Sequence, residues 1–192
     1  DTWKSRGLGD VYKRQVIQVP TGCGKTYAAL IGPLLKLKKQ KFSEGINILL
    51  VTPLKALSRD LKKSINNAVQ FFDVNISVEI RNGDTSNYEK RKQIIKPPNI
   101  LITTPESLTL LIANKEANKL FTNLFSIIID EWHELMGCKR GNQCELALSW
   151  LKGNNENIQI WAMSATIGNI EEAASSISVS YTHLTLPTKC SV

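Results

Sequence analysis

A glycine-rich loop at residues 20–26 limits the folds open to this chain more than any other feature. The loop reads Pro-Thr-Gly-Cys-Gly-Lys-Thr and stands between an apolar run, residues 16–19, and a stretch with helical apolar spacing, residues 26–39. In this context the backbone N–H groups of the loop can close on phosphate oxygens, and the helix N-terminus adds partial positive charge. The sequence therefore predicts a phosphate-binding loop between a strand and a helix.

The residues of this loop suit a nucleoside triphosphate with its metal ion. The backbone N–H groups that we expect around the phosphates belong to Thr21, Gly22, Cys23 and Gly24. Lys25 would reach the β- and γ-phosphates, and the Thr26 hydroxyl would be a ligand of Mg²⁺. We interpret Cys23 as a small loop residue rather than as a reactive thiol. The predicted cofactors are therefore ATP and Mg²⁺.

A second motif supplies the acids that phosphoryl transfer to water requires. Asp130 and Glu131 follow an isoleucine run at residues 127–129. At the carboxyl edge of a parallel sheet, Asp130 would face Mg²⁺ and Glu131 would orient or deprotonate the attacking water. His133 lies two residues further on, and the sequence leaves open whether it is a structural histidine or a sensor of bound nucleotide.

Short apolar runs alternate with stretches of helical spacing along the chain. The predicted strands are residues 16–19, 46–51, 77–80, 100–103, 127–130 and 158–163. The predicted helices are residues 26–39, 54–72 and 88–95, with two more that begin at residue 105 and near residue 142. Strands that alternate with helices favour an α/β domain with a mostly parallel central sheet and helices on both faces.

Composition excludes several other classes of protein. The 192 residues are 42% hydrophobic and 21% charged, which is typical of a folded domain and not of a disordered chain. We find no apolar run of about 18 residues, so we expect no membrane span. Four cysteines do not form a disulfide framework in a chain of this length, which favours a reducing, cytoplasmic setting.

Both ends of the chain differ from the rest. Residues 10–15 and residues 179–183 can be back-translated to one DNA string read in opposite orientations, as for the mosaic end of a sequencing adapter. We therefore expect residues 1–15 and 179–192 to be non-native and residues 16–178 to be one truncated domain. The two ends hold five basic and two acidic residues, so without them the net charge falls from +7 to +4. This charge alone does not predict a nucleic-acid partner.

The motifs together resemble superfamily 2 helicases with a D-E-x-H box. The loop at residues 20–26 and the segment Asp-Glu-Trp-His at residues 130–133 match the two nucleotide motifs of that family. Three further segments match family motifs in the expected order: residues 52–57, 103–107 and 164–166. Residues 81–85, 139–141 and 167–169 resemble the large helicase-related (Lhr-type) DNA helicases, which include forms associated with a DNA ligase.

The resemblance implies a RecA-like P-loop domain that serves as the first motor lobe of an ATP-dependent DNA helicase. It implies contacts to nucleic acid, single-stranded or duplex DNA, from Thr52, Pro53, Lys55, Thr103, Thr104, Pro105 and Ser107. It also implies that Ser164, Ala165 and Thr166 couple hydrolysis to strand movement. From the residues alone, ordinary helix capping by the threonines and serine is an equally good interpretation. A second lobe, which carries the opposing arginine in this family, has no counterpart in these motifs, although Arg140 would be an internal candidate.

Two other functions stay open at this point. One is a P-loop phosphotransferase or other NTPase with no nucleic-acid role, which would have no reason to carry the segments at residues 103–107 and 164–166. The other is a non-catalytic nucleic-acid-binding module, against which Lys25, Asp130 and Glu131 argue.

Overall fold

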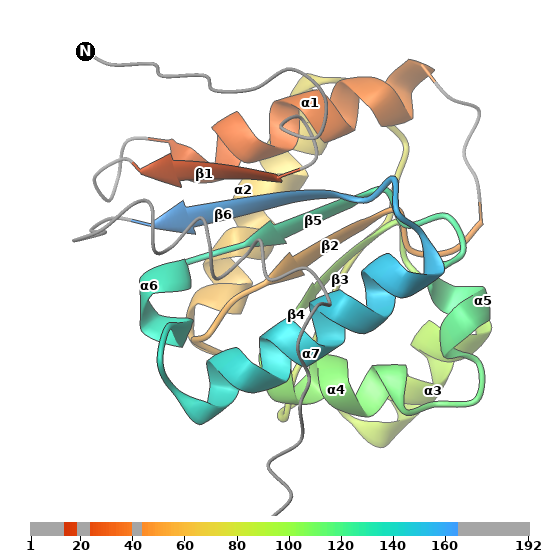
Figure 1. Ribbon diagram of the computed structural model, residues 1–192. Helices are drawn as coiled ribbons and strands as arrows, with labels where there is room; N and C mark the ends of the chain where they lie inside the picture. The colour runs from red at the N-terminus through yellow and green to blue at the C-terminus, as the bar shows by residue number, and fades with distance from the viewer. Residues whose placement is uncertain (1–13, 19–23, 40–43, 165–192) are drawn as a thin grey trace, which may run out of the picture.

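One parallel sheet of six strands forms the centre of the protein (Figure 1). The computed structural model describes residues 14–18, 24–39 and 44–164. The strands are β1 (Arg14–Gln18), β2 (Ile48–Val51), β3 (Val78–Arg81), β4 (Ile100–Thr103), β5 (Ser126–Ile129) and β6 (Gln159–Ser164). Their order across the sheet is β1-β6-β5-β2-β4-β3, and every neighbouring pair is parallel. The carboxyl ends of all six strands therefore share one edge.

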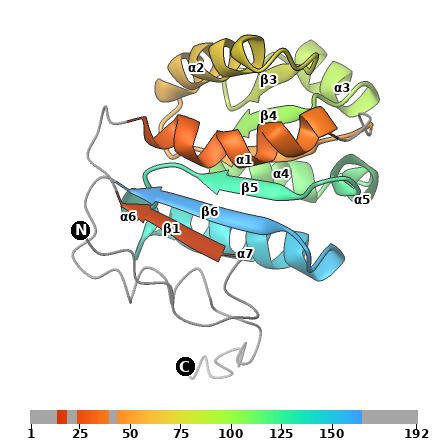
Figure 2. The same ribbon diagram turned by 90° about the horizontal axis from the view of Figure 1, so that it is seen from above.

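Helices cover both faces of this sheet (Figure 2). They are α1 (Lys25–Lys39), α2 (Leu57–Phe71), α3 (Asn87–Ile95), α4 (Pro105–Ile112), α5 (Ala117–Phe121), α6 (Trp132–Leu135) and α7 (Lys139–Asn154). One buried cluster joins the sheet to α1 and α2, and a second joins it to α4, α5, α6 and α7. Within the described part of the chain, no helix combines the length and apolar character needed to cross a membrane.

Strand β2 shows why the central strands read as continuous apolar runs. Ile48 and Leu50 belong to the cluster beneath α1 and α2, whereas Leu49 and Val51 belong to the cluster on the other face. All four side chains are fully buried. Because successive side chains of a strand point to opposite faces, a strand covered on both faces must be apolar at every position.

Local sequence signals set where two of the helices begin. The Ser86 side chain accepts a hydrogen bond from the Glu89 backbone N–H, and the Glu89 carboxylate accepts one from the Ser86 N–H, which makes a capping box at the start of α3. Thr104 caps α4 and Pro105 follows at the first helical position, where its missing N–H costs nothing.

The predicted order of strands and helices is confirmed, and each strand lies within two residues of its predicted bounds. Helix α1 continues through Gly32 and Pro33 as one helix. Helices α5 and α6 were not predicted, because five and four residues are too few to show a helical period. Strand β1 begins at Arg14, two residues before the expected start of the native domain at residue 16, and that domain boundary stays a prediction. The expected end of the domain at residue 178 lies outside the described residues.

Candidate functional site

The carboxyl edge of the sheet brings the sequence motifs together. The backbone N–H of Asp130 donates to the Val51 carbonyl oxygen at 2.8 Å, and the backbone N–H of Thr52 donates to the Thr103 carbonyl oxygen at 2.9 Å. The ends of β5, β2 and β4 are thus joined one to the next beyond their last paired residues. Segments that are distant in sequence become neighbours because all their strands end at this edge.

Lys25 and Glu131 form the central contact of the site. The Nζ atom of Lys25 lies 3.3 Å from the Oε1 atom of Glu131, and their side chains are only 7% and 15% exposed. Lys25 is the first residue of α1, and it follows Gly24, whose φ of +77° is a backbone conformation that favours glycine. The helix N-terminus adds partial positive charge at the same place. Anionic groups would therefore be attracted to this point.

Asp130 lies beside this pair and carries an unfavourable charge. Burial first, and then the charge of Glu131, raise the pKa of the Asp130 carboxyl to about 6, although Lys25 acts in the opposite direction. Two adjacent carboxylates at a buried edge are a donor set that suits a hard divalent cation, because the ion would offset both charges. Thr26 is the next residue after Lys25 and is half-buried. Asp130 and Thr26 thus fit the Mg²⁺ role expected of them.

Glu131 also lies close to His133, which in turn contacts Ser164. Its Oε2 atom is buried and makes no hydrogen bond with any described residue, although it lies 3.4 Å from Nδ1 of His133. The same Nδ1 atom lies 2.8 Å from the hydroxyl oxygen of Ser164 at the end of β6. Glu131 has a left-handed backbone with φ of 45°, a conformation that costs a non-glycine residue about 1–3 kcal/mol. The structure therefore places Glu131, His133 and Ser164 in one polar group with Lys25.

Several expected site residues cannot be placed in this way. Thr21, Gly22 and Cys23, together with Ala165 and Thr166, lie outside the described residues. Their roles stay predictions.

The residues expected to contact nucleic acid gather at the ends of β2 and β4. Thr52, Thr103 and Thr104 are essentially buried, and Pro105 and Ser107 follow in the first turn of α4. The Thr103 hydroxyl donates to the Arg81 carbonyl oxygen at 2.8 Å, and Thr104 accepts a hydrogen bond from the Ser107 N–H. The capping interpretation is confirmed for Thr104, and the nucleic-acid role of the group stays a prediction.

Lys55 differs from these threonines because its side chain is half exposed. Its Nζ atom pairs with the Asp84 carboxylate at 3.1 Å, and it lies over Gly83, where an added Cβ would come within 2.7 Å of that Nζ atom. Glycine at position 83 therefore allows the lysine to cross the turn at residues 82–85. This basic group is accessible to an anionic partner.

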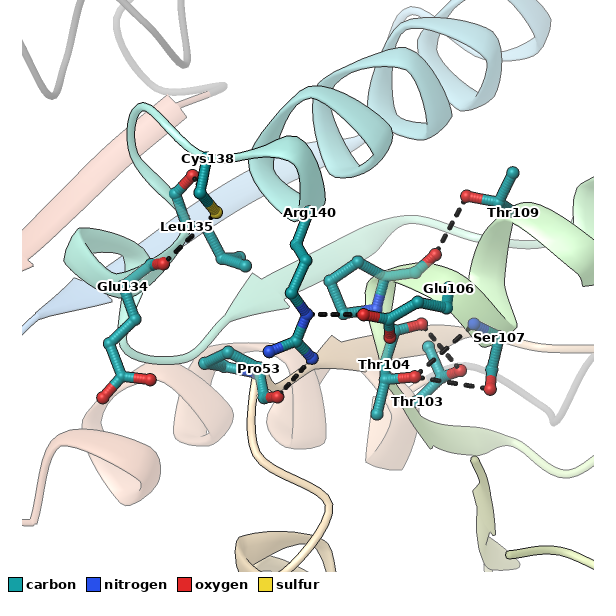
Figure 3. A network of polar contacts seen from close by, with 11 residues as sticks. Pro53, Thr103, Thr104, Glu106, Ser107, Thr109, Glu134, Leu135, Cys138 and Arg140 are labelled. Atoms are coloured by element: carbon teal, nitrogen blue, oxygen red, sulfur yellow. Dashed lines mark hydrogen bonds and ion pairs between the residues drawn. The ribbon is translucent and has the colours of Figure 1, made fainter. Parts of the chain in front are cut away.

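Arg140 makes structural contacts that were not predicted from the sequence. It lies in the first turn of α7, where its guanidinium donates from Nε to the Glu106 carboxylate and from Nη2 to the Pro53 carbonyl oxygen (Figure 3). These partners are 34 and 87 positions away in the chain. Only the resemblance of residues 139–141 marked this position, because no local pattern predicts such distant contacts.

Comparison with known proteins agrees with this arrangement. A family model of DEAD/DEAH box helicases matches residues 7–173. The chain is 35% identical to ATP-dependent helicase Lhr-Core protein 2 of Thermococcus barophilus over 173 residues, which are 83% of this chain and 20% of that protein. It is 36% identical to ATP-dependent helicase Lhr-Core of Sulfolobus acidocaldarius over 176 residues, 84% of this chain and 20% of that protein. The chain thus spans about a fifth of the length of the curated relatives it matches.

A solved structure shares both sequence and fold. The structure of Mycobacterium smegmatis helicase Lhr bound to ssDNA and AMP-PNP superposes with a TM-score of 0.72 at 33% identity, covering 83% of this chain and 22% of that one. The predicted RecA-like α/β fold is confirmed by this match and by the parallel sheet.

Proposed function

The chain belongs to the DEAD/DEAH box helicase family, and we propose that it is the ATP-binding first motor lobe of an Lhr-type DNA helicase. In this proposal ATP hydrolysis drives translocation along DNA or separation of its strands. The observation that carries the proposal is the Lys25–Glu131 contact beside Asp130 at the carboxyl edge of the sheet.

Each residue of that edge has a distinct proposed role. Lys25 binds the β- and γ-phosphates, and in doing so it exchanges its partner Glu131 for phosphate oxygens. Glu131 is then free to hold the attacking water and accept its proton, for which its Oε2 atom, which accepts no hydrogen bond from a described residue, is available. Asp130 and the Thr26 hydroxyl hold Mg²⁺, which would offset the negative charge of the phosphates.

His133 and Ser164 link the hydrolytic residue to the strand end of β6. The short distance between His133 Nδ1 and the Ser164 hydroxyl supports a role for His133 as a sensor. In this role His133 responds to bound nucleotide through Glu131 and transmits the change to residues 164–166. In the alternative, purely structural role of His133, bound nucleotide would not change the contact at Ser164.

The nucleic-acid partner is proposed to be DNA, held along the ends of β2 and β4. Lys55, in the segment at residues 52–56, is an accessible basic side chain. The segment at residues 104–107 forms the N-terminus of α4, and we place both groups on the DNA-binding side of the lobe. The ssDNA and AMP-PNP bound to Mycobacterium smegmatis helicase Lhr support a site of this kind. The described cysteines, Cys138 and Cys144, are free, which supports a cytoplasmic setting.

Binding measurements on this chain test the nucleotide part of the proposal. A fluorescent ATP analogue titrated with Mg²⁺ should bind the wild-type chain, and Lys25→Ala should weaken that binding at least tenfold, because the lysine is the main cation of the site. Lys62→Ala is the matched control, since Lys62 of α2 also pairs with a glutamate at 3.3 Å but belongs to none of the proposed nucleotide-binding segments, and it should bind like wild type. Equal affinity of the Lys25→Ala and wild-type chains would contradict the proposal.

A further inference from the structure

Arg140 joins two segments that the proposed function assigns to nucleic acid. Pro53 belongs to the loop after β2, and Glu106 lies in the first turn of α4. One planar guanidinium donates to both, from Nε to the carboxylate and from Nη2 to the carbonyl (Figure 3). Few side chains can hold two separate backbone segments in this way, because the donors of arginine are fixed in one plane.

The position of Arg140 is itself fixed from the nucleotide side of the lobe. The next residue, Gly141, lies so close to the end of α6 that an added Cβ would be 1.8 Å from the Leu135 carbonyl oxygen. Helix α6 begins immediately after Asp130 and Glu131. The first turn of α7 is thus packed against the short helix that follows the acidic pair.

The interaction also organises the Glu106 carboxylate. Partial burial would raise the pKa of Glu106, but the hydrogen bond from Arg140 and those at the start of α4 lower the pKa below its ordinary value. Glu106 is therefore an ionised partner that keeps the guanidinium in place. The side chains of Arg140 and Glu106 are 39% and 46% exposed, so the contact lies at the surface, at the start of α4.

We propose that Arg140 is a positioning residue for DNA: by holding Pro53 and Glu106, it sets the spacing between the loop at residues 52–56 and the start of α4, so that one strand contacts both. This inference rests on the proposed function. It also gives a continuous set of contacts from the acidic pair, through α6 and Gly141, to the DNA side of the lobe.

A direct contact between Arg140 and a phosphate is the competing explanation, and the two make opposite predictions for Glu106. Removal of the Glu106 carboxylate takes a negative charge away from the DNA side and frees the guanidinium. If Arg140 acted by charge alone, Glu106→Ala would bind DNA more tightly, because both changes favour an anion. If Arg140 acts by position, Glu106→Ala binds DNA less tightly in spite of the gain in positive charge.

The test measures fluorescence anisotropy of a labelled oligothymidylate with a helicase in which this chain forms the first lobe. We expect Glu106→Ala and Arg140→Lys each to weaken binding about tenfold, since each removes one charge-assisted hydrogen bond of the bridge. Glu106→Gln keeps an acceptor oxygen and should weaken binding less than Glu106→Ala does. This variant can be measured in its place if the alanine variant does not fold. Glu79→Ala is the matched control, because Glu79 is 49% exposed and also paired with a lysine, and its affinity should equal that of wild type.

Two other results have clear meanings. Tighter or unchanged binding by Glu106→Ala, or tighter binding by Glu106→Gln, would overturn the positioning role while leaving the proposed function intact. Failure of the wild-type helicase to bind the oligothymidylate would instead overturn the proposed function.

Discussion

The Nζ atom of Lys25 lies 3.3 Å from the Oε1 atom of Glu131, although the two residues are 106 positions apart in the chain. One comes from the first turn of α1 and the other from the turn after β5. In the absence of phosphate, the two side chains neutralise each other in a largely buried place. A bound nucleotide would compete for the lysine, and this exchange connects nucleotide binding to release of the glutamate.

The first prediction concerns Glu131 in a helicase that contains this lobe. Glu131→Gln should keep ATP binding but lower turnover about 10²–10⁴-fold, because an amide cannot accept the proton of the attacking water. Steady-state ATP hydrolysis measures the loss. Glu134→Gln, an exposed acid one turn further on, is the control and should keep normal turnover. Turnover of Glu131→Gln within a few-fold of wild type would contradict the assigned role.

The second prediction is that Lys25 and Glu131 are energetically coupled in the nucleotide-free chain. Lys25→Met or Glu131→Gln alone removes one partner of a largely buried ion pair and leaves the charge of the other, whereas the double variant removes both charges of the pair. Urea unfolding of the four proteins should therefore give a coupling free energy of about 1 kcal/mol or more. The Lys62–Glu79 pair has the same 3.3 Å separation but is 33% and 49% exposed, so its cycle should give less than about 0.5 kcal/mol. Equal coupling in the two pairs would show that burial does not strengthen the Lys25 contact.

Periodicity predicted the strands well because burial on both faces leaves a simple signal. Ile100, Leu101 and Ile102 are all buried, and no polar residue interrupts them. Helix α6 gave no such signal, since it has only four residues and begins directly after Glu131, whose backbone is left-handed. A left-handed glutamate cannot be deduced from local sequence, because that backbone region favours glycine.

The site was predictable in its parts but not in its internal contacts. Lys25 and Asp130 could be found from motifs because phosphate and metal binding require those residue types next to strand ends. The Ser164–His133 contact depends on the pairing of β5 with β6, and the Arg140 bridge depends on the packing of α7 beside α4. Such contacts follow from the sheet order, which alternation of strands and helices does not fix.

The third prediction uses the raised pKa of Asp130, about 6 in the folded protein against an ordinary 3.8. The folded state binds this proton more tightly than the unfolded state, so the residue lowers the free energy of unfolding as pH rises from about 4 to about 6. Asp130→Asn should therefore be more stable than wild type at pH 7 by up to about 3 kcal/mol in the nucleotide-free chain. The difference should shrink as pH falls through 6 and disappear below about 4. Chemical unfolding at several pH values measures it, and a difference that does not change with pH would contradict the explanation.

The fourth prediction is that this chain alone neither hydrolyses ATP at a useful rate nor separates strands. Lys25, Thr26, Asp130 and Glu131 form one side of the site, and an opposing arginine contributes about 10³–10⁵ in rate in related phosphoryl-transfer enzymes. The internal candidate, Arg140, is instead engaged by Pro53 and Glu106. ATPase rates with and without single-stranded DNA test this expectation. Robust DNA-stimulated turnover by the chain would mean that it supplies its own arginine.

The fifth prediction concerns the contact that fixes the start of α7. Gly141→Ala would put a Cβ 1.8 Å from the backbone oxygen of Leu135, so α6 and α7 must separate. We expect a loss of about 1–3 kcal/mol in the free energy of unfolding. In a helicase that contains this lobe, oligothymidylate affinity should also fall, because Arg140 moves with the helix.

Gly153 in the same helix provides the control for this substitution. An added Cβ at position 153 meets nothing within 4 Å, so Gly153→Ala should instead stabilise the chain by about 0.5–1 kcal/mol through helix propensity. Thermal melting of both variants compares the same chemical change at two sites of one helix. If Gly141→Ala were as stable as Gly153→Ala, the close packing of α7 on Leu135 would not constrain the fold. In that case the position of Arg140 would have to be maintained by Glu106 and Pro53 alone.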